Sequence, residues 1–253
     1  GASGKKLGSG TTLPLALRRV QLAGGAIRIA EERRLDGSRF VFARMPDAIE
    51  IGRAPADDAA LDAELARRML AWAAPATLDE IAWWAGIGKR AARAAVDAIG
   101  AKHEIRKPLG EVWSLENEPG AKTSPATPHF LPFRDNYLLF RRSLLPLVDE
   151  PGGVEVLSWK NEPIPLAEAD SLHQNAIVIG GRLRGVWEFD PEAAEVAWRL
   201  FLPATRSEKR DVAEAAESLG RWIRDELGDA RFYAFDTAKT RAPRIAFARG
   251  ERG

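Results

Sequence analysis

The stretch that decides the fold is Thr77-Leu-Asp-Glu-Ile-Ala-Trp-Trp-Ala-Gly-Ile-Gly-Lys89, which has the pattern of two short helices joined by a tight turn. Thr77 followed by Glu80 three residues later forms a capping box, which predicts that a helix begins here. Gly86-Ile-Gly88 then interrupts the helix and permits a sharp turn. The pattern therefore predicts a helix-turn-helix.

The residues on either side of this stretch extend it to a larger unit. A helix is predicted before it, from Asp57 to Ala73, and the second turn helix is predicted over residues 89–100. Two extended runs, 102–107 and 111–115, follow on either side of a Pro-Leu-Gly turn and predict a hairpin. Three helices and a hairpin in this order predict a winged helix-turn-helix over residues 51–120. In such a unit the second turn helix enters the major groove of DNA and the hairpin touches the DNA backbone.

Basic side chains gather on the predicted groove helix and hairpin. We expect DNA contacts from Lys89, Arg90 and Arg93 on the helix, and from Lys102, Arg106 and Lys107 on the hairpin. Two alternatives stay open. Arg93 and Asp97 stand at i and i+4 and could form an ion pair on a solvated face. Helix-turn-helix geometry also occurs in protein-binding and architectural modules.

Residues 1–50 resemble the second half of another such unit. Thr11 and Thr12 predict a helix start, and Asp36-Gly37 is typical of a hairpin turn. We expect a groove helix and hairpin here, in which the DNA-contacting candidates are Arg18, Arg19 and Arg28. The helices that precede these elements in a complete unit are absent, so we expect that the chain begins inside a domain.

Residues 121–253 are predicted to form a small antiparallel sheet or β-barrel-like domain that follows a linker at 117–128. Strands are expected at 154–159, in a hairpin at 175–189 across Gly180-Gly181, and at 195–202. A long amphipathic helix is expected over 205–227, and a last strand from Arg244 to Ala248. The predicted fold class is therefore α+β, with tandem winged helix-turn-helix units before a barrel-like domain that has one long helix.

The charge distribution is consistent with DNA binding although the formal net charge is only +1. Residues 89–107 carry six Lys or Arg against two Asp or Glu, and residues 1–45 carry nine against three. Such blocks permit a basic face on a nearly neutral protein. The alternative is surface charge that cancels once the chain folds.

The sequence contains no pattern that identifies catalytic chemistry. There is no cysteine, and His103, His129 and His173 lack the spacing of metal ligands. Phosphate-loop, nucleophile-elbow and zincin motifs are absent. The run His173-Gln-Asn175 is interpreted as a hydrogen-bonded cluster at a strand end. No apolar run reaches the roughly 18 residues of a membrane helix. We expect no cofactor, no metal and no membrane contact.

Several of these segments together resemble a known family. Pro75-Ala-Thr-Leu-Asp-Glu-Ile-Ala-Trp-Trp-Ala-Gly86 is similar to a signature of bacterial winged-helix proteins related to the AlkZ and YcaQ DNA glycosylases. The run 131–139 is similar to that family's LPxxDxYLL segment, and the run 176–187 to its glycine-rich hairpin ending in tryptophan. Thr11 to Arg18 fits the helix of an earlier winged unit. The matches are in the same order and cover most of residues 11–190.

The resemblance implies DNA binding. Characterised members of the family excise alkylated bases and unhook interstrand crosslinks without a metal. The family uses a Q-x-Q or Q-x-D motif in an N-terminal unit. This chain has two glutamines, Gln21 and Gln174, and neither stands in such a motif. No catalytic role is therefore transferred. Arg134, Asp135 and Tyr137, polar groups in an aromatic run, are either paired in the core or border a cleft.

The function predicted from the sequence is that of a DNA-binding protein resembling AlkZ-like DNA glycosylases and lacking their catalytic motif. We expect it to be a monomer on double-stranded DNA in the cytoplasm, associated with the nucleoid. It would belong to a DNA-repair hydrolase if an N-terminal part carries the glutamine motif. A non-catalytic winged-helix DNA-binding or regulatory protein is the first alternative, and a protein-interaction module is the second.

Overall fold

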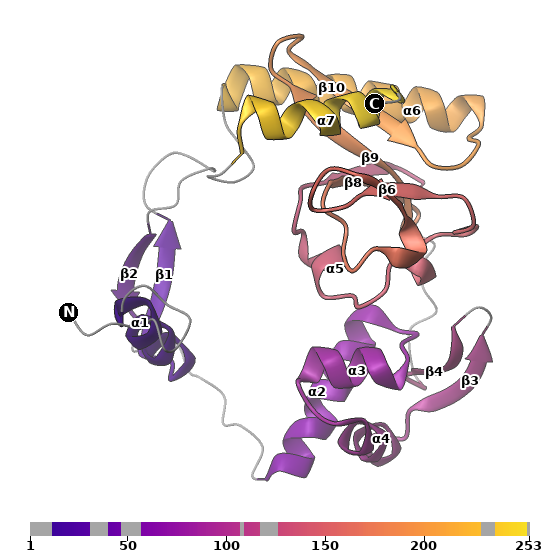
Figure 1. The fold of residues 1–253 in the computed structure, drawn as a ribbon. Helices are drawn as coiled ribbons and strands as arrows, with labels where there is room; N and C mark the ends of the chain where they lie inside the picture. Colours follow the sequence, from indigo (N-terminus) through magenta and orange to yellow (C-terminus); the bar gives the residue numbers. More distant parts are fainter. Residues whose placement is uncertain are drawn as a thin grey trace. The chain divides into compact units, whose positions relative to one another are not determined.

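The computed structural model describes residues 12–30, 40–46, 57–106, 109–116, 126–228 and 236–251. They form helices and small antiparallel sheets, in agreement with the mixed fold predicted (Figure 1). The helices are α1 (Leu13–Leu22), α2 (Asp58–Ala73), α3 (Leu78–Ala85), α4 (Lys89–Ala98), α5 (Asn136–Leu139), α6 (Arg206–Trp222) and α7 (Ala238–Arg249), with shorter turns η2 (Leu145–Leu147), η3 (Leu166–Glu168) and η4 (Ile223–Leu227). The strands are β1 (Ala26–Ala30), β2 (Phe40–Arg44), β3 (Lys102–Arg106), β4 (Gly110–Ser114), β5 (Pro128–Leu131), β6 (Glu155–Leu157), β7 (Pro163–Pro165), β8 (Asn175–Ile179), β9 (Arg182–Asp190) and β10 (Glu195–Leu200).

These elements divide between two compact units. Helix α1 and strands β1 and β2 belong to the first unit, and the elements from α2 to α7 belong to the second. In the first unit β1 and β2 pair in antiparallel fashion, with Arg28 opposite Phe42. The helix followed by a hairpin that was predicted here is therefore present.

The helices α2, α3 and α4 precede the β3–β4 hairpin in the predicted order. Asp57 caps α2 by accepting a hydrogen bond from the backbone N–H of Ala60. Thr77 and Glu80 form the predicted capping box of α3. Gly86 ends α3 with a φ of +70°, a conformation that glycine adopts without a steric cost. Local side-chain chemistry thus fixes where these helices begin and end.

Trp113 joins the β3–β4 hairpin to these helices. Its backbone N–H donates to the carbonyl oxygen of Ala76 at 2.8 Å, and the N–H of Ala76 donates back at 3.0 Å. The Trp113 side chain is 2% exposed and packs in the core that α2, α3 and α4 share, together with Leu70, Ile81 and Val96. The hairpin is therefore held in a fixed position beside α4.

The largest sheet contains four antiparallel strands in the order β10-β9-β8-β5. The predicted hairpin across Gly180-Gly181 is confirmed as β8 and β9. Strands β6 and β7 form a separate antiparallel pair. Helices α6 and α7 both pack against β10, and α7 also packs against β9 (Figure 1).

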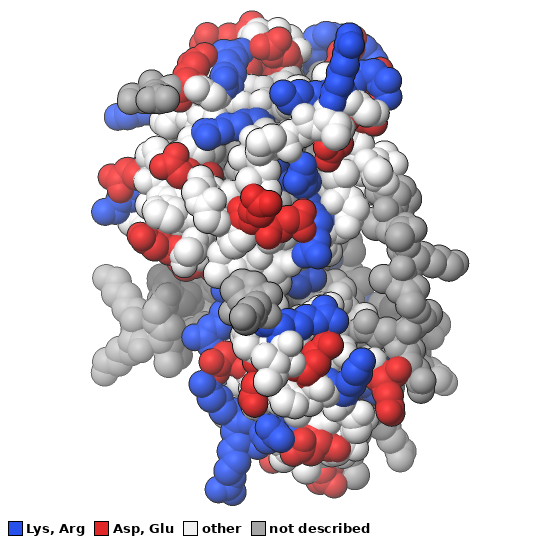
Figure 2. Space-filling view, turned by 90° about the vertical axis from the view of Figure 1, so that its right-hand side faces the viewer, with Lys and Arg blue, Asp and Glu red and all other residues white. Residues whose placement is uncertain are grey.

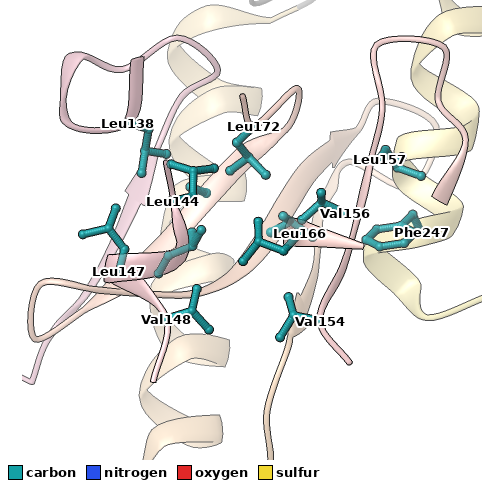
Figure 3. Close-up of a cluster of buried hydrophobic side chains, with 13 residues drawn as sticks. Leu138, Leu144, Leu147, Val148, Val154, Val156, Leu157, Leu166, Leu172 and Phe247 are labelled. Carbon is teal, nitrogen blue, oxygen red and sulfur yellow. The ribbon is translucent and has the colours of Figure 1, made fainter. Parts of the chain in front are cut away.

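A buried apolar cluster lies beneath the sheet and its connecting loops (Figure 3). Leu138 and Leu172 belong to this cluster, and each is 7% exposed. Phe247 of α7 also belongs to it, so the last helix contributes directly to the core. The members of the cluster are Leu138, Leu144, Leu147, Val148, Val154, Val156, Leu157, Leu166, Leu172, Ala176, Leu183, Val186 and Phe247.

The prediction of a last strand from Arg244 to Ala248 is wrong, because these residues lie inside helix α7. The predicted long helix over 205–227 is present as α6, which η4 continues to Leu227, and α7 is an additional helix that the sequence did not predict. Pro243 lies in the interior of α7, where proline is normally unfavourable. The short apolar run after this proline is compatible with a strand, but tertiary contacts decide the outcome.

A buried ionic cluster holds α7 against β9. Arg244 donates from Nε to Glu188 Oε2 at 2.6 Å and from Nη2 to Asp236 Oδ1 at 2.8 Å. Arg241 donates to the other oxygen of Asp236 at 3.3 Å. All four side chains are buried. Burial alone would lower the pKa of Arg244, but the carboxylates of Glu188 and Asp236 raise it above its usual range.

Candidate nucleic-acid interface

Helix α4 has one buried side and one basic side. Ala92, Ala95 and Val96 are buried against the neighbouring helices. Lys89, Arg90 and Arg93 are exposed on the side away from these residues. The two-sided pattern expected from the sequence is therefore present, and it places three cations in solvent.

The three cations of α4 differ in their partners. Lys89 Nζ lies 2.6 Å from Asp79 Oδ1, and Arg93 Nε lies 3.2 Å from Asp97 Oδ2. The i,i+4 ion pair considered from the sequence is thus confirmed. Arg90 forms no ion pair with any residue that the structure describes. Of the three, Arg90 is the most readily available to a phosphate group.

The β3–β4 hairpin adds two exposed cations, Lys102 at the start of β3 and Arg106 at its end. Arg106 Nη2 pairs with Glu104 Oε1 at 2.6 Å on the same strand. Lys102, at the other end of β3, has no acidic partner within the described ranges. Lys107, the sixth candidate, lies outside the described residues.

Trp113 connects the basic side of α4 to the hairpin. The guanidinium carbon of Arg93 lies 5.5 Å from the centre of the Trp113 ring. On the hairpin, Trp113 stands opposite His103, and their ring centres are 4.8 Å apart. Lys102 precedes His103 in the chain. The structure therefore brings one cation of α4, Arg93, to the anchored tryptophan that also packs against His103 of the hairpin.

The ion pairs on this surface leave its cations accessible. Exposed pairs contribute only about 0–1 kcal/mol, so a phosphate can replace the carboxylate at little cost. Acidic and basic side chains are interspersed on the face drawn in Figure 2, in keeping with the small net charge. Electrostatic attraction of a polyanion by this surface would therefore depend on a few local cations, since the charge of the whole molecule is nearly zero.

Three predicted DNA contacts lie in the first unit. Arg18 and Arg19 are exposed on α1, and Arg28 is exposed on β1. The elements that carry them, α1 and the paired strands β1 and β2, form a helix and hairpin within this unit.

The three residues predicted to be core-paired or to border a cleft have different roles. Asp135 caps the short helix α5 by accepting from the N–H of Tyr137 at 2.8 Å. The Tyr137 hydroxyl donates to the carbonyl oxygen of Gly181 at 2.8 Å, which ties α5 to the β8–β9 turn. Arg134 is exposed and lines a small hollow. Arg134 therefore remains available to a ligand, whereas the polar groups of the other two are used within the fold.

The cluster at residues 173–175 is a hydrogen-bonded strand end, as predicted. Gln174 Oε1 accepts from the N–H of Leu157 at 2.8 Å, and Asn175 Oδ1 accepts from the N–H of Phe133 at 2.7 Å. His173 Nε2 lies 3.2 Å from Asp170 Oδ1, and this contact lowers the pKa of Asp170. The hollow that His173 and Phe133 share is not predicted from the sequence, since the two residues are far apart in the chain.

Two classes of site were sought and not found within the described ranges. No group of three or more histidine, aspartate or glutamate side chains there could hold a metal ion. No helix among the described residues is sufficiently long and apolar to span a membrane.

Comparison with known proteins identifies the family. The family model described as DNA glycosylase AlkZ-like matches residues 5–222, so the chain belongs to the AlkZ-like DNA glycosylase family. Among solved structures, the DNA glycosylase AlkZ of Streptomyces sahachiroi matches with a TM-score of 0.52 and 17% sequence identity. The match covers 87% of this chain and 54% of that chain, so this chain spans about half the length of its structural relative. No curated protein matches.

Proposed function

We propose that this chain is a DNA-binding part of an AlkZ-like DNA glycosylase. In this proposal residues 51–120 form a winged helix-turn-helix, residues 1–50 contribute part of a second one, and residues 121–253 form the barrel-like domain. The observation that carries the proposal is the pairing of α4 with the β3–β4 hairpin through Trp113. In this proposal α4 is the groove helix and the hairpin is the wing, and Trp113 would hold them in a fixed relation.

In this proposal α4 enters the major groove, and the hairpin lies along the phosphate backbone. Helices of this kind present residues near their N-terminus to the base edges. Lys89 and Arg90 occupy the first two positions of α4, and Arg93 is one turn further. Lys102, Arg106 and Lys107 would contact phosphates from the wing. Arg18, Arg19 and Arg28 would do the same from the first unit.

We assign hydrolysis of the glycosidic bond to no residue of this sequence. Such hydrolysis needs a water molecule positioned beside the sugar and charge stabilisation at the reacting centre. Gln174 is 3% exposed, and its side-chain oxygen already accepts a backbone hydrogen bond, which favours a structural role. The second candidate function is a DNA-binding protein without catalysis, which is consistent with the structural role of Gln174. Excision of an alkylated base by this chain would reject the function without catalysis.

The salt dependence of duplex binding tests the proposal. Fluorescence anisotropy should give a steep fall of log affinity with log salt, with a slope of about −0.9 per phosphate contacted. Arg90→Ala and Lys102→Ala each remove an exposed cation that has no acidic partner among the described residues, so each should make the slope less steep by about 0.9. Arg210→Ala removes an exposed arginine of α6, which is 64% exposed, and should leave the slope unchanged.

The contrary results are equally clear. Binding without salt dependence, or equal slopes for the wild-type chain and both variants, would reject the proposed interface. Either result would favour a module that binds another protein.

A further inference from the structure

A partly enclosed hollow of about 180 Å³ lies beside helix α5. Its apolar side is formed by Leu138 and Leu172, two members of the buried cluster that are labelled in Figure 3. Its other side carries Phe133, Arg134 and His173. The hollow thus combines an apolar floor with aromatic and polar walls.

The volume of the hollow suits a single planar ring system. Sites for drug-sized ligands occupy about 300–1,000 Å³, which is well above this value. An apolar cavity of about 150 Å³ is sufficient for benzene. A whole nucleotide would exceed the hollow, whereas one aromatic heterocycle fits its size.

The side chains of the walls suit an aromatic heterocycle. The rings of Phe133 and His173 have centres 6.3 Å apart with an angle of 37° between their planes. The guanidinium carbon of Arg134 lies 5.1 Å from the centre of the Phe133 ring. Aromatic rings and guanidinium planes are the groups on which unpaired bases stack. Ser171 and His173 add polar atoms to the same hollow.

The backbone at Arg134 is strained in a way that glycine would avoid. The N–H of Asp135 donates to the carbonyl oxygen of Pro132 at 3.0 Å, which closes a turn with Arg134 as its third residue. The φ of Arg134 is +67°, and turns with this conformation strongly favour glycine there. Strained residues of this kind persist where the surrounding structure fixes them, and they cluster at ligand sites. It holds the guanidinium at the rim of the hollow.

We propose that this hollow binds one unpaired nucleobase of the DNA that the chain holds. The inference rests on the proposed DNA binding and adds a recognition site on the last domain. The base would stack against Phe133 and His173, and its edge would meet polar atoms of Arg134 and Ser171.

Two duplexes of equal length test the inference, one fully paired and one with a single unpaired adenine at its centre. The wild-type chain should bind the second about tenfold more tightly, as expected when one base stacks on an aromatic side chain. Leu139 lines the hollow and is 41% exposed. Leu139→Trp should fill the hollow and reduce the preference to less than about twofold. Its affinity for the paired duplex should not change.

Two further variants complete the experiment. Leu61→Trp enlarges an α2 residue of similar exposure, 36%, and should keep the tenfold preference. Phe133→Leu keeps an apolar side chain but removes the ring, so it should lose most of the preference.

The outcomes separate the two proposals. Salt-dependent binding of both duplexes without any preference overturns the inference alone. A preference that Leu139→Trp leaves intact also overturns it. Failure to bind either duplex overturns the proposed function and this inference together.

Discussion

Replacing Arg244 by methionine would remove the centre of the buried ionic cluster while keeping most of the side-chain volume. Arg244 contacts Glu188, Asp236 and the carbonyl oxygen of Thr240. After the substitution Asp236 still has Arg241 at 3.3 Å. Glu188 retains one long contact, from Asn175 Nδ2 at 3.4 Å. The substitution therefore leaves Glu188, which is 1% exposed, without a charged partner.

The expected cost follows from this geometry. Removing one partner of a buried ion pair typically costs about 3–5 kcal/mol, because the other charge stays buried and uncompensated. We expect the free energy of unfolding to fall by about 3–4 kcal/mol. This is a large part of the roughly 5–15 kcal/mol that stabilises a domain. The double variant Arg244→Met/Glu188→Gln, which buries no lone charge, should recover at least about 2 kcal/mol of the loss.

The loss of stability in the Arg244→Met variant should also depend on pH. Burial raises the pKa of Glu188 above 4.5, the ordinary value for glutamate, although Arg244 opposes the rise. Without Arg244 the pKa rises further, and the folded state keeps a proton that the unfolded chain has lost. Stability from such a group is present below the unfolded pKa and is lost as pH rises through the folded pKa. The difference between variant and wild type should therefore be largest near about pH 7 and shrink towards about pH 4.5.

Urea unfolding followed by tryptophan fluorescence measures these differences, because the buried Trp187 is next to Glu188 in β9. Arg249→Met is the matched control on the same helix. Arg249 pairs with Asp190 and Glu195 but is 33% exposed, so its loss should cost only about 1 kcal/mol. If Arg244→Met costs no more than Arg249→Met, the ionic cluster does not hold α7 in place.

Three further predictions concern single positions. Arg134→Gly should stabilise the chain by about 1 kcal/mol in urea unfolding, because it relieves a positive φ, and should weaken binding to unpaired bases. Gly185→Ala should destabilise it by at least about 2 kcal/mol, because the new Cβ would lie 2.1 Å from the backbone oxygen of Arg199; a loss below about 0.5 kcal/mol would contradict this close approach. Asp97→Asn should raise affinity for duplex DNA by up to about fivefold, since it frees Arg93; an unchanged anisotropy titration would argue against that contact.

The sequence by itself determined the features that depend on neighbouring residues. The Thr77–Glu80 capping box and the Gly86 turn act over three or four residues, so their pattern was sufficient to place α3 and α4. The glycine pair at 180–181 placed the β8–β9 hairpin in the same way. The ordered motifs also indicated the AlkZ-like family, which the family model confirms.

Only the tertiary structure decided the features that depend on distant residues. The short apolar run in residues 244–248 is compatible with a strand, but α7 is held by a hydrogen-bonded ion pair from Arg244 to Glu188, 56 positions away. The hollow forms because Asn175 binds the backbone of Phe133 across 42 positions and so brings His173 near its ring. The physical reason is that side-chain spacing records the local period of a helix or strand. It does not record which distant segment will supply the partner of a buried charge.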